Sequence, residues 1–327
     1  MPIFSIYTPT YNGEKFIRKT LESVLSQSLT DFEWYIHDDG SSDSTFEILQ
    51  EYAVLDNRII LERGKNKTSI LAMNKFIDNA SGRYIAFIDH DDLWSKDYLR
   101  NVYEHLNANP DVEMAITSYT FTDETGNILD WKTPNLKDNE ILSKTELKKR
   151  FLTTLDIEGF RWNKFVATDI LQNSGVRIED KFPADIYMEY KLTSYINKAV
   201  LIDEKGYSYR QSPHSEVGTV NPENTKGMLA AFHTINEWAR ADGLAEEGKY
   251  YQSFGYIDVL YNSTKKNRLS KAQVSEILVE FPWNQEVGIS TFGLFKLFSK
   301  YKNLRNGHLE FAIKTILVRI RILLMKK

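Results

Sequence analysis

The order of apolar and polar positions predicts strands and helices that alternate along the first part of the chain. Short apolar runs rich in β-favouring residues are separated by segments whose apolar residues recur at helical spacing. The expected strands are 3–7, 32–37, 59–62 and 84–88, and the expected helices are 14–28, 44–52 and 70–80. Such alternation is typical of an α/β fold with a doubly wound, mostly parallel sheet flanked by helices.

After residue 90 the pattern mixes strand and helix, and it indicates a continuation of the same domain. A stretch of low hydrophobicity then covers residues 216–226, and the sequence beyond it is helical in pattern and rich in aromatic residues. We therefore expect a domain boundary near 215–227. The larger α/β domain is predicted over 1–220, and a smaller, mainly helical domain is predicted over 221–327.

Polar clusters follow three of the predicted strands, at 8–13, 38–43 and 89–92. Ligands of parallel sheets bind outside the carboxyl ends of the strands, so these clusters predict a binding site. Asp89, Asp91 and Asp92 lie within four residues, and their mutual repulsion is relieved when a cation is bound. Carboxylate oxygens suit Mg²⁺ or Mn²⁺. The alternative is a solvated acidic loop, or a helix cap formed by Asp91 or Asp92.

Charge and composition narrow the possible functions. The 327 residues contain no cysteine, which excludes a disulfide scaffold, thiolate metal sites and a cysteine nucleophile. The net charge of −4 combines an acidic body with a basic end: residues 291–327 hold nine Lys and Arg against one Glu. An acidic body argues against nucleic acid as a partner. No secretory leader and no apolar run long enough to cross a membrane is expected.

The segment 311–327 combines an apolar face with five basic residues and no acid. This pattern is typical of an amphipathic helix that lies on an anionic membrane surface. A terminal helix that packs on its own domain or on another subunit explains the pattern equally well. The sequence leaves both interpretations open.

Several motifs, in their order and spacing over residues 1–215, resemble those of the family 2 glycosyltransferases. These enzymes have the GT-A fold and use nucleotide-diphosphate sugars. The motifs are Thr8-Pro9-Thr10-Tyr11-Asn12, Asp38-Asp39-Gly40-Ser41-Ser42-Asp43, Ala80-Ser81-Gly82-Arg83-Tyr84-Ile85, Asp89-His90-Asp91-Asp92, Arg161-Trp162-Asn163-Lys164-Phe165, Phe182-Pro183-Ala184-Asp185 and Tyr209-Arg210-Gln211. The resemblance implies that 1–220 is a GT-A catalytic domain for donor and acceptor.

The resemblance also implies roles for individual residues. Asp185 is expected to be the catalytic base that accepts the proton of the acceptor hydroxyl, although a helix N-cap is the alternative. The expected nucleotide-sugar-binding residues are Pro9, Tyr11, Asp39, Asn66 and Asp89, and the expected metal ligands are Asp91, Asp92 and His214. Asp92 is expected either to bind the metal or to hold the loop, and His214 is either a ligand or an exposed bystander.

Two positions depart from the family pattern. Ala184 replaces the usual glutamate beside the catalytic aspartate, and Met73 lies where an arginine is usual. The missing arginine removes a positive charge near the nucleotide or diphosphate. Donor affinity or donor choice is therefore expected to differ from the family norm.

The function that follows is a metal-dependent, inverting glycosyltransferase. Mn²⁺ or Mg²⁺ is the expected cofactor, a UDP-sugar the expected donor, and a glycan, lipid-linked or glycoprotein hydroxyl of bacterial surface polysaccharide synthesis the expected acceptor. The expected location is cytoplasmic, and peripheral on the inner face of the membrane under the interpretation in which the segment 311–327 binds lipid. The alternatives are a non-catalytic nucleotide- or glycan-binding module, and a sugar-1-phosphate nucleotidyltransferase. The latter needs a glycine-rich, basic loop after the first strand, which residues 9–13 do not provide.

Overall fold

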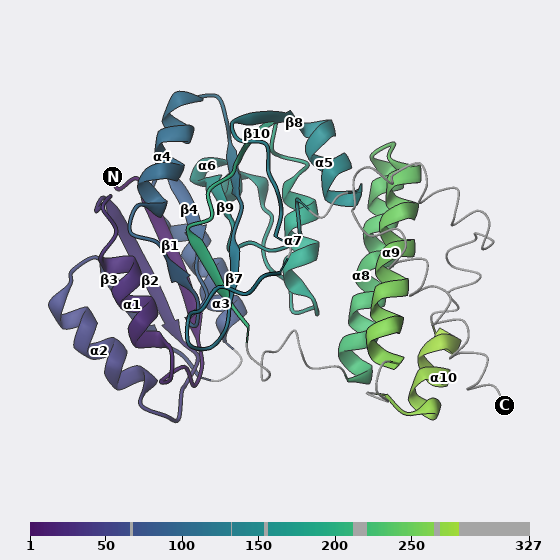
Figure 1. Ribbon diagram of the computed structural model, residues 1–327, viewed down its shortest axis with the longest axis horizontal. Coiled ribbons are helices and arrows are strands. Elements are labelled where there is room, and N and C mark those ends of the chain that lie inside the picture. The colour runs from purple at the N-terminus through teal and green to yellow at the C-terminus, as the bar shows by residue number, and fades with distance from the viewer. Residues whose placement is uncertain (66–67, 132, 154–155, 212–220, 265–268, 281–327) are drawn as a thin grey trace. The chain divides into compact units, whose positions relative to one another are not determined.

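The structure is a computed structural model that describes residues 1–65, 68–131, 133–153, 156–211, 221–264 and 269–280 (Figure 1). The chain forms two compact units. The first consists of Met1–Leu147, Gly159–Asp180 and Met188–Ser212, and the second consists of Lys148–Glu158, Lys181–Tyr187 and Pro213–Lys327. The chain therefore passes between the units several times, for the last time after Ser212.

The first unit contains an eight-stranded sheet that confirms the predicted α/β class. Its strand order is β3 (Ile59–Arg63), β2 (Phe32–Asp38), β1 (Phe4–Thr10), β4 (Tyr84–Phe87), β9 (Lys164–Ala167), β6 (Met114–Thr117), β10 (Lys198–Ile202) and β8 (Glu140–Ser143). β9 is antiparallel to both of its neighbours and β8 is antiparallel to β10, whereas the other pairs are parallel. The sheet is thus mostly parallel, as the alternating pattern indicates.

Three helices lie close to the positions that the pattern predicts: α1 (Ile17–Leu25), α2 (Thr45–Leu55) and α3 (Ser69–Asn79). Two further helices of this unit, α4 (Tyr98–Ala108) and α6 (Thr168–Ser174), come later in the chain. The predicted helix 14–28 is shorter at both ends. Its first turn is set by Gly13, whose carbonyl accepts from the backbone N–H groups of Phe16 and Ile17. Ile17, Leu21 and Val24 lie on one face of α1 and are buried.

The core of the first unit lies on both faces of the sheet. Phe4 and Ile6 are fully buried, and the ring of Phe4 packs edge-on against Phe165 of β9, with centroids 5.5 Å apart. Trp34 is also fully buried, and its indole N–H donates to the Thr8 hydroxyl at 2.9 Å. A buried polar group needs such a partner. The central strands therefore hold their carboxyl ends, and the loops that follow, in fixed positions.

A second sheet of three strands lies beside the acidic loop. Its order is β5 (Leu93–Trp94), β11 (Tyr207–Arg210) and β7 (Thr120–Thr122). β11 is antiparallel to β5 and parallel to β7, and Tyr207 lies opposite Trp94. This pairing brings a segment about residue 210 to the loop at residue 90, which local sequence pattern does not predict.

The second unit is helical in its described part, which confirms the predicted helical character of the C-terminal region. Its main helices are α8 (Pro222–Ala241), α9 (Ala245–Thr264) and α10 (Lys271–Glu280). α8 and α9 lie side by side (Figure 1), and a Cβ added at Gly255 of α9 meets the Phe232 ring of α8 at 2.4 Å. Glycine therefore allows the close packing of the two helices.

Two further helices, α5 (Lys144–Thr153) and α7 (Ala184–Leu192), each contain a border between the units. Among the described residues, no helix has the length and apolar character needed to cross a membrane. The predicted amphipathic segment 311–327 lies outside the described residues.

Candidate active site

The loops that follow β1 and β2 are joined by hydrogen bonds at the carboxyl edge of the sheet. Asp39 N donates to Thr10 O at 2.8 Å, and Asn12 N donates to the Ser41 hydroxyl at 2.9 Å. Asn12 returns a bond, because its Oδ1 accepts from Ser42 N at 2.9 Å. Asn12 adopts a positive φ of 48°, which asparagine tolerates better than most residues. The first two polar clusters of the sequence are therefore one structural element.

The acidic loop after β4 packs against the same region. A Cβ added at Gly13 lies 2.5 Å from Cδ2 of the His90 ring, so only glycine fits beneath that histidine. The Thr20 hydroxyl of α1 lies 2.8 Å from the carbonyl oxygens of both His90 and Asp92. These contacts fix the backbone that carries Asp89 and Asp91. All three predicted loops thus meet at one edge.

Asp38 and Asp39 have different surroundings. Asp38 is fully buried, accepts from the backbone and hydroxyl of Ser41, and pairs with Nε of Arg63 at 3.1 Å. Asp39 is 8% exposed, and its Oδ1 accepts from the backbone N–H of Thr68 at 2.8 Å and from its hydroxyl at 2.9 Å. Asp38 therefore holds the turn, while Thr68 fixes the orientation of Asp39, the predicted nucleotide-binding residue.

Asp92 is enclosed in the protein. Its side chain is fully buried, its Oδ2 accepts from the Tyr207 hydroxyl at 2.6 Å, and its Oδ1 accepts from Arg210 N at 2.8 Å. Burial, with the charges of Asp91 and Asp89, raises the pKa of the Asp92 carboxyl well above its ordinary value. These bonds favour the second of its two predicted roles, in which Asp92 holds the loop to β11. The metal role of Asp92 stays a prediction.

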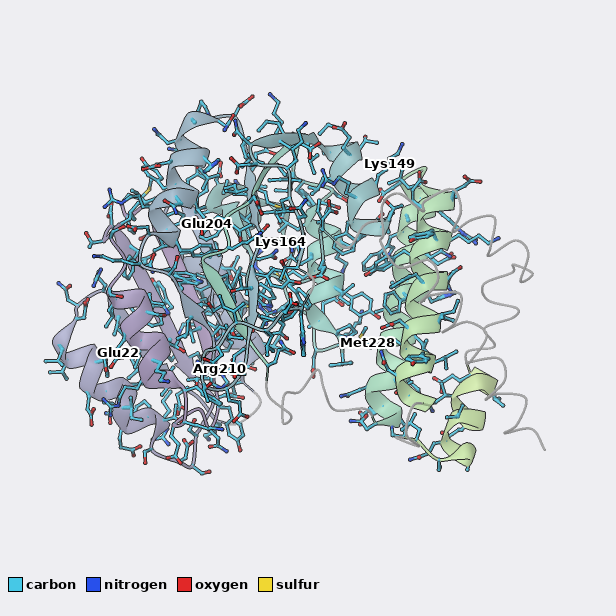
Figure 2. All side chains as sticks on the ribbon, in the orientation of Figure 1. Glu22, Lys149, Lys164, Glu204, Arg210 and Met228 are labelled. Atoms are coloured by element: carbon cyan, nitrogen blue, oxygen red, sulfur yellow. The ribbon has the colours of Figure 1, made fainter. Side chains whose placement is uncertain are left out.

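Arg210 also binds this loop, a role that the sequence pattern did not predict. It is 2% exposed, its Nε donates to the carbonyl of Asp91, and its Nη1 donates to the carbonyl of Glu124. Its guanidinium carbon lies 4.6 Å from the centre of the Phe16 ring (Arg210 is labelled in Figure 2). Arg210 therefore fixes the acidic loop, although it lies 119 residues from Asp91 along the sequence.

Asp89 and Asp91 are half-buried and lie in the loop that these contacts hold. Burial raises the pKa of Asp92, the charges of Asp91 and Asp89 raise it further, and a divalent cation would relieve the repulsion among the three carboxylates. Carboxylate oxygens are hard donors that suit Mg²⁺ or Mn²⁺. Within the part of the chain that the structure describes, no group of three or more His, Cys, Asp or Glu side chains is arranged to hold a metal ion. The donor chemistry fits a cation that takes further ligands from a diphosphate.

The remaining predicted residues have varied surroundings. Pro9 lies in β1 opposite His37 and is half-buried, and Tyr11 is 44% exposed just after β1.

Asp185 is half-buried in the first turn of α7, which begins at Ala184, so Asp185 is inside the helix and is not its N-cap. It belongs to the second unit, and its catalytic role stays a prediction. Asn66 and His214 lie outside the described residues.

Met73, where the family resemblance leads to an expected arginine, is 2% exposed on α3. Phe76 of the same helix packs on Tyr7 of β1, with ring centroids 5.0 Å apart, and on Phe87 of β4 at 6.2 Å. This aromatic cluster supports the ends of β1 and β4. Met73 of α3 is therefore a buried packing residue and carries no charge.

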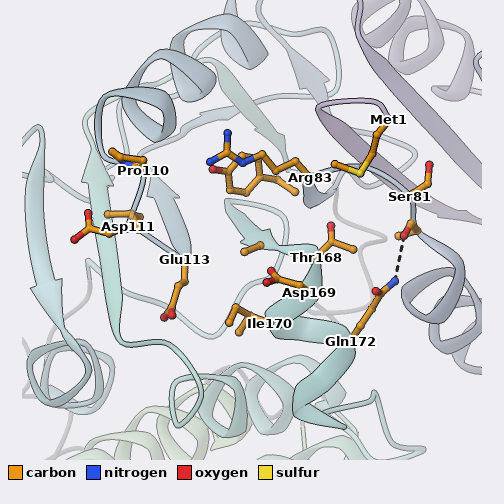
Figure 3. Close-up of a pocket in the computed structure, with 15 residues that line it drawn as sticks. Met1, Ser81, Arg83, Pro110, Asp111, Glu113, Thr168, Asp169, Ile170 and Gln172 are labelled. Atoms are coloured by element: carbon orange, nitrogen blue, oxygen red, sulfur yellow. Dashed lines mark hydrogen bonds between the residues drawn. The ribbon is translucent and has the colours of Figure 1, made fainter.

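A cavity of about 790 Å³ lies at the other edge of the sheet (Figure 3). Its lining includes Arg83, which precedes β4, Glu113, which precedes β6, and Thr168, which follows the antiparallel β9. These positions are the amino-terminal ends of the parallel strands. The cavity is thus separate from the edge at which the acidic loops meet.

The comparisons with known proteins agree with the motifs. A sequence model of the family described as Glycosyl transferase family 2 matches residues 5–169. The Bacillus subtilis protein TuaG, named as a teichuronic acid biosynthesis glycosyltransferase, is 38% identical over 130 residues. The match covers 39% of this chain and 51% of TuaG, so the chain spans about half the length of that relative.

Two solved structures share the fold. Residues 1–349 of Staphylococcus aureus TarS, in complex with UDP-GlcNAc, give a TM-score of 0.61 at 18% identity, over 92% of this chain and 91% of that chain. A mannosyltransferase from Pyrobaculum calidifontis, in complex with GDP-Man and Mn²⁺, gives 0.52 at 14% identity, over 100% and 88%. Because the family model matches residues 5–169, half of the chain, the chain belongs to glycosyl transferase family 2.

Proposed function

We propose that this chain is an inverting glycosyltransferase of bacterial surface polysaccharide synthesis. It transfers a sugar from a nucleotide-diphosphate sugar, with UDP as the nucleotide, to a hydroxyl of a glycan, lipid-linked or glycoprotein acceptor. The observation that carries the proposal is the joining of the β1, β2 and β4 loops at one edge of the sheet. Family membership, the name of TuaG and the UDP-GlcNAc complex of TarS support it.

The residues of this edge divide between nucleotide binding and loop support. The exposed ring of Tyr11, beside Pro9, offers an aromatic face for a nucleobase. Asp39, oriented by Thr68, accepts from an N–H group of the base or from a ribose hydroxyl. Asn66 completes this group in the proposal, on the basis of the family pattern.

Asp91, with Asp89 beside the ribose, would hold Mn²⁺ or Mg²⁺. The bound ion neutralises the negative charge that develops on a nucleoside diphosphate leaving group. Asp92, Tyr207 and Arg210 keep the backbone of this loop in place. His214 is retained as a further candidate ligand.

Asp185 is proposed as the general base, which takes the proton from the acceptor hydroxyl. A positioned base contributes about 10²–10⁴-fold to the rate. In the proposed mechanism one base acts without a covalent enzyme intermediate, which corresponds to a single displacement. The new glycosidic bond then forms on the face opposite to the leaving nucleotide, with inversion at the anomeric carbon.

A thermal-shift screen of nucleotide sugars, with and without Mn²⁺, tests the proposal because a ligand that binds only the folded state raises the melting temperature. We expect a UDP-sugar to raise it, and to be turned over with release of UDP. Release of pyrophosphate identifies a nucleotidyltransferase instead, and binding without turnover of any donor identifies a binding module. Either result overturns the proposed activity.

A further inference from the structure

A basic residue reaches the acidic edge of the sheet from β9. β9 runs antiparallel to β4, with Phe165 opposite Ala86, so the residues before Phe165 emerge at the carboxyl end of β4. Arg161 lies in that segment, and its guanidinium carbon is 5.9 Å from the centre of the ring of Phe87, the last residue of β4. The loop of Asp89 starts two residues later. Arg161 is therefore placed beside the candidate nucleotide site.

The turn that carries Arg161 is held by buried neighbours. Trp162 is 3% exposed and stacks on Tyr207, with centroids 4.5 Å apart. Asn163 is 1% exposed, its Nδ2 donates to Thr117 O at 3.0 Å, and its own carbonyl accepts from Thr117 N at 3.0 Å. Because this backbone is fixed before any ligand arrives, less conformational freedom is lost when the guanidinium binds an anion.

The charge of Arg161 acts on Tyr7 of β1. Burial raises the pKa of the Tyr7 hydroxyl in β1, and the positive charge of Arg161 opposes that increase, whereas Glu62 and Asp39 add to it. Tyr7 lies opposite Phe87 in the β1–β4 pair. Arg161 and Asp39 therefore both act electrostatically on the same Tyr7 hydroxyl, with opposite sign.

Two other arginines near these loops bind groups of the protein itself. The exposed Arg63 pairs with the buried Asp38, and the buried Arg210 donates to the carbonyls of Asp91 and Glu124. Arg161 is half-buried and lies in the turn that precedes β9. An anionic donor that approaches the carboxylates of this edge meets repulsion unless a cation offsets it.

We propose that Arg161 is a binding residue for the diphosphate of the nucleotide-sugar donor, an inference that rests on the proposed function. The guanidinium group presents two parallel N–H donors that match two phosphate oxygens, and it stays charged at all pH values at which a protein folds. In this proposal the positive charge comes from the turn before β9, since α3 presents the buried, uncharged Met73.

Calorimetric titration tests this role with UDP, GDP, UMP and GMP as probes, in the presence of Mn²⁺. The proteins compared are the wild type, Arg161→Ala and a matched control, Arg83→Ala. Arg83 is exposed at the opposite edge of the sheet, so its removal changes the net charge equally. We expect Arg161→Ala to weaken binding of the diphosphate by about tenfold or more, because hydrogen bonds to charged groups are strong. The monophosphate should lose less, and Arg83→Ala should bind as the wild type does.

The outcomes separate the two proposals. A wild type that binds neither UDP nor GDP overturns the proposed function, and the inference with it. If the wild type binds a diphosphate and Arg161→Ala binds it equally well, or loses mono- and diphosphate affinity by the same factor, only the role of Arg161 is overturned. Should Arg161→Ala fail to fold, Arg161→Gln, which keeps the length and polarity of the side chain, is judged by the same criterion.

Discussion

Thr68 controls how Asp39 presents its carboxylate. Both the backbone N–H and the hydroxyl of Thr68 donate to Oδ1 of Asp39. Replacing the hydroxyl by a methyl group in Thr68→Val removes one of the two bonds without a large change of volume. We expect nucleotide affinity to fall about threefold to tenfold, the range of one net hydrogen bond.

Thr68→Ser is the matched control, because it keeps the hydroxyl and should bind nucleotide as the wild type does. Titration of UDP into the three proteins measures the difference. Equal affinity of Thr68→Val and wild type would show that Asp39 does not depend on this bond.

Individual residues of the site differ in how far their roles could be predicted from the sequence. Asp89, Asp91 and Asp39 were identified as candidates because acidic residues follow strands. Arg161 and Arg210 were visible only as members of family motifs, since their partners lie far away along the sequence: Arg210 bonds to the loop of Asp92 across 118 residues. No local pattern encodes such a contact.

At the scale of elements, a buried ion pair connects β9 to α7 within the first unit. Nζ of Lys164 lies 3.8 Å from Oε2 of Glu189, and both side chains are 3% exposed (Lys164 is labelled in Figure 2). Removing one member of a buried pair leaves the other charge poorly compensated, at a cost of about 3–5 kcal/mol. We expect Lys164→Met to lower the free energy of unfolding by this amount in urea titrations.

The double variant Lys164→Met/Glu189→Gln should recover part of the loss, because it removes the remaining buried charge as well. A double variant that is no more stable than Lys164→Met would contradict an ionic origin. The pair would then contribute mainly through packing.

The ion pair of Asp56 and Arg58, in the connection between α2 and β3, predicts how the stability of the fold depends on pH. Asp56 accepts from Arg58, whose Nη2 lies 2.7 Å from Oδ2, and this bond holds the pKa of Asp56 below its ordinary value of 3.8. A lowered pKa stabilises the fold above the ordinary value, and the contribution is lost as the pH falls through the folded pKa. We expect Asp56→Asn to be less stable than wild type at pH 6, and the difference to shrink below pH 4. A difference in urea midpoint that does not change with pH would contradict this assignment.

Strand and helix positions in the first 90 residues followed from the sequence because each element carries its own periodicity. The antiparallel insertion of β9 between β4 and β6 did not, since pairing partners are chosen by the whole sheet. That insertion brings the Arg161 turn to the carboxyl edge. The part of the site that sequence reasoning missed is therefore the part built by long-range strand pairing.

At the scale of the whole molecule, the chain combines a net negative charge with a basic C-terminal segment. If residues 311–327 form an amphipathic helix on anionic lipid, their deletion should abolish sedimentation with phosphatidylglycerol vesicles at low salt. Vesicles of neutral lipid serve as the control and should bind neither protein. Equal binding of full-length and deleted protein to anionic vesicles would reject a membrane role for this segment.

Each of the two units is built from several separate segments of the chain. A single cut near residue 220 is the simplest division from sequence, but segments 148–158 and 181–187 belong to the mainly helical unit. Asp185, the proposed base, is thus carried by the unit that does not contain the acidic loops. Chain connectivity alone gives no sign of this exchange, because both segments lie within stretches of ordinary globular composition.

The most direct test of the account is the Asp185→Asn variant in two parallel assays, donor binding by calorimetry and sugar transfer by UDP release. The amide keeps the shape of the side chain but cannot accept the acceptor's proton. We predict donor affinity within about twofold of wild type and a transfer rate lowered at least about 10²-fold. Transfer at a near-normal rate, or loss of donor binding in place of transfer, would contradict the assignment of Asp185 as the base.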